Sequence, residues 1–142
     1  MSYDFKKTIH DTFEKQQFLN FIGAKISVIE HGYCEMILPY RDEPTQQNKF
    51  FHAGIVGTLA DNAAGMAGFS TMEEGSSVLS VEYKVNLLAP AKGDLLIARA
   101  KVIKAGRTLT VCTADIFAKT GEEEKLCATA TVTLMALKNY TK

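Results

Sequence analysis

The sequence lacks an excess of either charge, since 16 Lys and Arg residues offset 16 Asp and Glu residues in a chain of 142. Nucleic-acid-binding domains usually carry a basic patch or stripe, so this balance argues against one. No apolar run reaches membrane-spanning length, and the first 18 residues carry too many charges for a signal peptide. We therefore expect a protein without nucleic-acid or membrane partners.

Cysteine and histidine are scarce and widely spaced. The three cysteines, Cys34, Cys112 and Cys127, form no CxxC pair, which predicts reduced thiols in small core positions and a cytoplasmic location. The three histidines, His10, His31 and His52, lie about twenty residues apart, which is not a metal-ligand spacing. We expect no metal site and no cofactor.

Repeats, low-complexity tracts and Pro/Ser-rich linkers are absent too, so we expect a single domain over residues 1–142. Hydrophobic residues make up 46% of the chain, enough for a real core. An amphipathic pattern predicts an N-terminal helix over 5–20, within the segment 1–20. A hairpin follows over 24–30 and 33–39, then a polar loop over 40–51 and a helix over 53–71.

Beyond residue 76 the hydrophobic period changes to two. Alternation in 80–88, 94–104, 108–119 and 126–137 predicts four half-buried antiparallel strands. In the first of these segments Ser80 falls on the polar face. The residues expected in the core are Tyr83, Val85, Leu87, Leu59 and Met66. The predicted architecture is α+β, with one antiparallel sheet packed against the long helix.

The helix 53–71 has an unusual composition, because nine of its nineteen residues are Ala or Gly. Each interior Gly costs about 1 kcal/mol relative to Ala, so its four glycines need a reason. Gly54, Gly57, Thr58, Asp61, Gly65 and Gly68 fall on one side of a helical wheel. Close packing against the sheet and passage of a ligand beside Asp61 both explain this.

Two residues around this helix suggest chemistry, and each has a plainer explanation. Asp61 is either a carboxylate paired at a subunit boundary or a general base or nucleophile whose pKa an apolar setting raises. His52 precedes the helix, where the backbone amides of Ala53 and Gly54 point outward and suit an oxygen that gains negative charge. A histidine hydrogen-bonded locally at a helix start is the alternative.

The combination is more specific than its parts. Gln46, the His52-Ala53-Gly54 run and an Asp nine residues after the His resemble the hotdog-fold acyl-CoA thioesterases of the phenylacetic-acid-degradation (PaaI-like) type. Ser80 and the run LLAPAKGD continue the resemblance, which covers about residues 20–137. It implies a hotdog fold, in which a curved antiparallel sheet wraps around the central helix. It also implies a thioester hydrolase that works as a homodimer, with a pair of dimers forming a homotetramer.

The resemblance also implies roles for single residues. Asp61 would activate water or attack the thioester, and the amides of Ala53 and Gly54 would form the oxyanion hole beside His52. Gln46 and Ser80 would orient the water or the carboxylate, with Ser80 reaching in from the neighbouring subunit. Ala53 stands where the family usually has glycine, which leaves open the acyl group that is tolerated.

Substrate contacts follow less directly. Coenzyme A needs cations for its phosphates, and the candidates are Lys104, Arg107 and Lys84. The acyl pocket could be aromatic or medium-chain, with Phe50, Phe51, Met66, Phe69 and Met72 as candidate walls. One alternative function is a non-catalytic acyl-CoA-binding regulator, although binding alone needs no buried acid. The other is a dehydratase, which would use a histidine in the central helix, and this helix has none.

Overall fold

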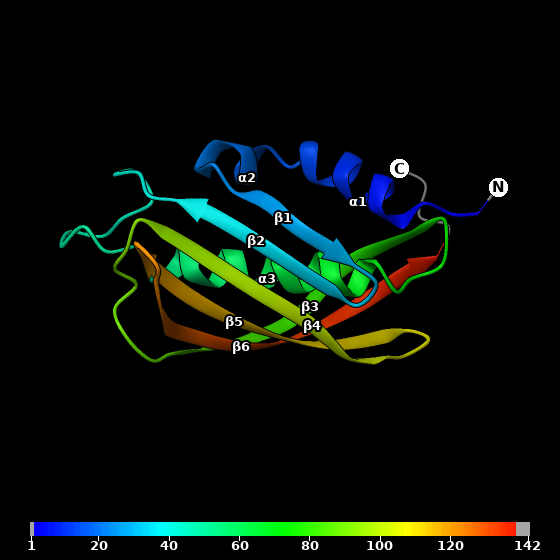
Figure 1. Cartoon of the computed structure of the whole chain (residues 1–142). Helices are drawn as coiled ribbons and strands as arrows, with labels where there is room; N and C mark the ends of the chain where they lie inside the picture. Colours follow the sequence, from blue (N-terminus) through cyan, green and yellow to red (C-terminus); the bar gives the residue numbers. More distant parts are fainter. Residues whose placement is uncertain (1, 139–142) are drawn as a thin grey trace.

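A computed structural model of the chain describes residues 2–138, and in it an antiparallel sheet curves around one long helix (Figure 1). The helices are α1 (Phe5–Glu14), α2 (Gln17–Ile22) and α3 (Ala53–Phe69). The strands are β1 (Lys25–Glu30), β2 (Tyr33–Pro39), β3 (Ser76–Leu87), β4 (Leu95–Ala105), β5 (Leu109–Thr120) and β6 (Glu123–Lys138). The sheet order is β1-β2-β4-β5-β6-β3, so β1 and β3 are its two edges.

The α+β hotdog architecture is thus confirmed. The predicted domain, 1–142, includes Met1 and residues 139–142, which lie outside the described residues, and a single domain stays a prediction. No helix within residues 2–138 has both the length and the apolar character needed to cross a membrane.

The core lies between the concave face of the sheet and α3. On β2, Cys34, Met36 and Leu38 are buried, and they alternate with more exposed neighbours as the period of two predicts. Helix α3 contacts all six strands, and Leu59 and Met66 are buried as expected. The helix ends two residues before the predicted boundary, where the amide of Ser70 still donates to the carbonyl of Met66 at 3.1 Å. The three cysteines are buried free thiols, in agreement with their predicted core positions.

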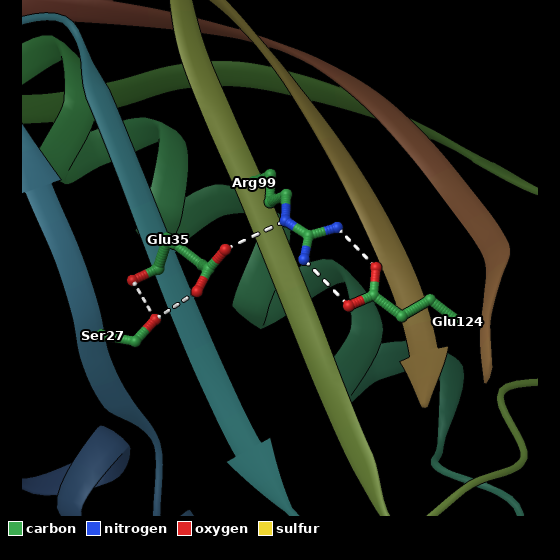
Figure 2. Close-up of polar contacts among 4 residues, drawn as sticks. All are labelled: Ser27, Glu35, Arg99 and Glu124. Atoms are coloured by element: carbon green, nitrogen blue, oxygen red, sulfur yellow. Dashed lines mark hydrogen bonds and ion pairs between the residues drawn. The ribbon is translucent and has the colours of Figure 1, made fainter. Parts of the chain in front are cut away.

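A polar network braces the opposite, convex face of the sheet (Figure 2). Arg99 on β4 donates through Nε to Glu35 on β2 at 2.9 Å and through both terminal nitrogens to Glu124 on β6 at 2.7 and 3.0 Å. Its guanidinium carbon lies 4.9 Å from the ring centroid of Phe117 on β5. Glu35 also accepts from Ser27 on β1 at 2.8 Å. Because these side chains span five strands, they hold the curvature that positions α3.

The N-terminal segment differs from the prediction of one helix over 5–20. Gln16 adopts an extended conformation, so the segment divides into α1 and α2. The side chain of Asn20 donates to the carbonyl of Glu14 at 2.9 Å and satisfies a backbone group that the break leaves free. Figure 1 shows both helices running along β1. The ion pair between Lys6 and Glu30, at 3.0 Å, ties α1 to that edge.

Candidate active site

Asp61 sits in the middle of α3 and is half-buried. The Ser80 hydroxyl on β3 donates to its Oδ1 at 2.6 Å. Burial raises the pKa of the Asp61 carboxyl above its ordinary value, and the bond from Ser80 partly offsets this rise. Within residues 2–138 Asp61 forms no ion pair. Its Oδ2 is left for a water or a substrate.

This bond corrects the expectation that Ser80 points away from its own helix and meets a partner's Asp61. The strand alternation is interrupted, because the β3–β6 register shifts between Ser80 and Glu82. Such a bulge places one extra residue in a strand and changes which face the following side chains occupy. Ser80 therefore faces α3, even though the alternation after the bulge would place an even-numbered residue on the opposite face. Tyr83 faces α3 as well, since its ring would lie 3.6 Å from a β-carbon built on Gly57.

The exposure of side chains on β3 contradicts part of the predicted core. Tyr83 is 50% exposed and Leu87 is 59% exposed, whereas Val85 is partly buried. β3 is an edge strand, so one of its sides has no neighbouring strand within residues 2–138. Leu79, Val81 and Leu88 are exposed there too, which makes this edge markedly apolar.

At the start of α3, His52 caps the helix. Its Nδ1 accepts the amide of Gly54 at 2.8 Å, so Nε2 is the ring nitrogen that can donate. The amide of Gly54 is therefore occupied, and it does not point freely outward as predicted. The amide of Ala53 has no acceptor within the described part of the chain. Of the two expected oxyanion donors, only Ala53 is free.

A cavity of about 590 Å³ opens beside this helix start, and we call it the loop cavity. It includes Gln46, His52 and Ala53, so three of the predicted site residues lie together, apart from Asp61 and Ser80. The Gln46 side chain accepts the amide of Asn48 and braces its own loop. The remaining lining comes from Phe50, Phe51, Val56, Cys127 and the run 87–91.

A second cavity of about 390 Å³, here called the helix cavity, lies on the other side of the helix start. Gly54, Ile55 and Thr58 of α3 form one wall, and Phe18 and Phe21 of α2 form the opposite one. The two phenylalanines are 54% and 70% exposed, and sequence reasoning missed them. The prediction of one helix over 5–20 gave no sign of this exposed pair, so the break at Gln16 was the missing information.

The glycines of α3 do not share one environment. A β-carbon on Gly68 would collide with Leu134, so this glycine permits close packing against β6. One on Gly65 would meet nothing within 4 Å. Gly54 gives room to the His52 ring. Close packing against the sheet is thus confirmed at Gly68, and passage of a ligand beside Asp61 stays a prediction.

Other predicted residues lie elsewhere. Arg107 lines a cavity with Thr71 and Met72 at the C-terminal end of α3, and Lys104 belongs to the same hairpin. A 17-residue helix spans about 25 Å, which separates them from His52 within one chain. Lys84 is exposed on β3. Met66 and Phe69 are core residues rather than pocket walls.

Comparisons with known proteins identify the family and the fold of the chain. The pattern of the Thioesterase superfamily matches residues 48–125. A thioesterase family protein from Silicibacter pomeroyi superimposes with a TM-score of 0.93 at 47% identity, over 95% of this chain and 99% of that one. Human acyl-coenzyme A thioesterase 13 is 28% identical over 119 residues, 82% of this chain and 84% of that one.

A structure of the Escherichia coli PaaI protein, from the phenylacetic acid degradation operon, has a TM-score of 0.84 at 20% identity. It covers 94% of this chain and 93% of that one, and at this identity it supports the fold alone. The family pattern matches more than half of the sequence and includes the helix that carries His52 and Asp61. The chain belongs to the thioesterase superfamily.

Proposed function

We propose that this protein hydrolyses the thioester bond of an acyl-CoA, with Asp61 as general base. The observation that carries the proposal is the Asp61–Ser80 pair, a half-buried carboxylate without a cation partner in residues 2–138. Ser80 occupies Oδ1, so Oδ2 can hold a water and accept its proton. The hydroxide forms a bond to the thioester carbon, and the C–S bond breaks. The thiolate of CoA leaves with the proton from Asp61.

The developing oxyanion needs a donor, and the free amide of Ala53 at the positive end of α3 supplies one. Within one chain this donor is too far away. Ala53 and Asp61 are eight residues apart, which is about 12 Å along a helix. One water bridges only about 6 Å, because each of its two contacts is about 3 Å long. The first amides of a helix also point away from its C-terminal end.

A second copy of the chain resolves this mismatch. We infer a homodimer in which the β3 edges meet about a two-fold axis. Asp61 lies beside Ser80 on β3, and Gly57, near the helix start, lies beside Tyr83 and Val85. Antiparallel pairing of the two β3 strands would bring each Asp61 toward the partner's helix start. Each site would then combine Asp61 and Ser80 of one chain with Gln46, His52 and Ala53 of the other.

Mixing inactive variants tests this division. In a mixed dimer of Asp61→Ala and His52→Ala, one site carries both defects and the other carries neither. Random pairing makes about half of the dimers mixed, so about a quarter of the parental activity should return. Asp61→Ala mixed with Ser80→Ala is the matched control, because both changes affect the same half-site and no activity should return. The reverse pattern would contradict the proposed division.

The activity itself is tested by a hydrolysis screen over short, long, branched and aromatic acyl-CoAs. Turnover that Asp61→Asn abolishes supports a thioesterase. Tight acyl-CoA binding without turnover of any substrate would instead support the regulatory alternative.

A further inference from the structure

The side chain of Tyr83 reaches from β3 onto the surface of α3. A β-carbon built on Gly57 would lie 3.6 Å from Cε2 of the Tyr83 ring and 3.8 Å from its hydroxyl oxygen. The ring therefore lies against the helix where Gly57 has no side chain. Tyr83 is 50% exposed in the single chain, and its hydroxyl forms no hydrogen bond within residues 2–138. A phenol is thus held against α3 with its O–H free to donate.

Gly57 marks the midpoint of the proposed site along α3. It lies midway in sequence between Ala53 and Asp61, so each is about 6 Å away along the helix axis. In the proposed dimer Asp61 meets the helix start of the partner, and two-fold symmetry then requires the axis to pass level with Gly57. Tyr83 lies against Gly57, so the dimer would place it beside this axis and cover it. Its hydroxyl would need an acceptor there, because a buried donor without a partner costs free energy.

The candidate site is short of a donor for a developing oxyanion. The His52 ring accepts the Gly54 amide at 2.8 Å, so Ala53 supplies the single free amide of the two expected in the described chain. Oxyanion holes combine several preorganised donors, and tyrosine hydroxyls serve in this role as well as backbone amides. An oxyanion has three lone pairs, so a second donor can approach it from another direction. The Tyr83 hydroxyl is such a donor, about one helical turn from Asp61.

From this juxtaposition we propose that Tyr83 is a further catalytic residue, whose hydroxyl donates to the thioester carbonyl oxygen together with the amide of the partner subunit's Ala53. As hydroxide adds to the carbonyl carbon, the electron pair of the C=O double bond moves to oxygen, and both donors stabilise that charge. The pair returns when the C–S bond breaks, and Tyr83 keeps its proton throughout. This inference rests on the proposed function for its substrate and on the proposed dimer for its place in the site.

The plainer role for Tyr83 is to pack its ring against Gly57, and phenylalanine would serve that role equally well. Tyr83→Phe therefore removes the hydroxyl and keeps the packing. It should lower kcat about 10²-fold and leave KM unchanged, because an oxyanion donor acts in the transition state. Light scattering should show the same dimer. Tyr33→Phe is the matched control, because it removes a hydroxyl from the convex face of β2 and should change neither constant.

The pH profile separates this role from a hydrogen bond to Asp61. A hydroxyl that donated to Asp61 would favour the charged carboxylate, so its loss would move the acid limb of kcat/KM to higher pH. A donor to the carbonyl oxygen leaves that limb in place. An upward shift of the acid limb in Tyr83→Phe would overturn the assignment.

Two CoA ligands that cannot be hydrolysed test the contact without turnover. One is an S-(2-oxoalkyl)-CoA, a ketone that keeps a carbonyl near the sulfur, and the other is the S-alkyl-CoA of equal length, a thioether without a carbonyl. In Tyr83→Phe, calorimetry should show roughly three- to tenfold weaker binding of the ketone and unchanged binding of the thioether. Equal losses for both ligands, or no loss for either, would overturn the assignment.

These outcomes differ from a failure of the proposed function. A ketone-specific loss in a protein that turns over no acyl-CoA would support the Tyr83 contact and contradict hydrolysis. Wild-type turnover that Tyr83→Phe retains in full would support hydrolysis and overturn the role of Tyr83.

Discussion

At the scale of single residues, the candidate site depends on the hydrogen bond between Ser80 and Asp61. Asp61 is half-buried with one hydroxyl donor and no cation within residues 2–138. Its sequence position suggested catalysis, and so did its poor fit to a helix interior. Ser80 was predicted for the site but placed on the wrong chain, because sequence alternation carries no signal for a bulge.

Asp61→Asn should lower turnover by about 10²–10⁴-fold, since the amide keeps the shape but cannot accept the proton of water. It should also raise the free energy of unfolding at neutral pH. Burial raises the pKa of Asp61, so the folded state holds its proton more tightly than the unfolded state, and ionisation of Asp61 destabilises the fold as pH rises. Urea unfolding at pH 7 and steady-state kinetics measure the two effects.

The same pKa shift sets the acid limb of the pH profile. The wild-type kcat/KM should fall as pH drops through the pKa of Asp61, with a midpoint above the usual aspartate range. Ser80→Ala removes the bond that favours the charged form, so it should move this midpoint upward. A midpoint that stays fixed in Ser80→Ala would contradict the role given to that bond.

At the scale of elements, strand and helix boundaries were predictable because the hydrophobic period changes at clear turn signals. Residues 33–39 and the start of α3 at Ala53 agree with the structure. The alternation of apolar and polar residues did not reveal the register shift at Val81 or the break at Gln16. The register shift depends on pairing with the distant strand β6, and the break at Gln16 on local side-chain contacts such as Asn20 with Glu14. For the same reason the exposed side of β3 was mistaken for core.

The glycines of α3 make a matched pair for testing this helix. Gly65→Ala should raise the free energy of unfolding by about 1 kcal/mol, because a methyl group there meets open space and Ala favours helix. Gly68→Ala should lower it by roughly 1–3 kcal/mol, because the methyl group collides with Leu134 against tightly packed β6. Thermal or urea unfolding of both variants checks the contrast. Equal shifts would mean that the two positions are not packed as described.

At the scale of the whole molecule, Asp61 and Ser80 lie apart from Gln46, His52 and Ala53 within one chain, and the β3 edge is apolar. The resemblance predicted a dimer, but the reason for it comes from the length of α3 between Ala53 and Asp61. That spacing can be read from the sequence, whereas the exposed apolar edge of β3 could not.

Val81→Lys places a charge on the exposed β3 edge and should convert the dimer to monomers. Activity should be lost in parallel, because each site as proposed needs both chains. Val28→Lys is the matched control: Val28 is an exposed apolar residue beside a register shift on the other edge, β1, and its replacement should preserve both dimer and activity. Light scattering after gel filtration, with kinetics on the same fractions, gives the answer. A fully active monomer would rule out the shared site.

The bulge at Val81 also divides β3 into two halves that face different surroundings. Ser80, just before it, donates to Asp61, whereas Tyr83 and Val85, after it, lie beside Gly57 near the helix start. Substitutions in the later half could thus change the affinity between the two chains of the proposed dimer while the Ser80 hydroxyl still donates to Asp61. Loss of the single extra residue would instead rotate one half relative to the other. One backbone irregularity would therefore separate the proposed chemistry from the surface proposed to join the two chains.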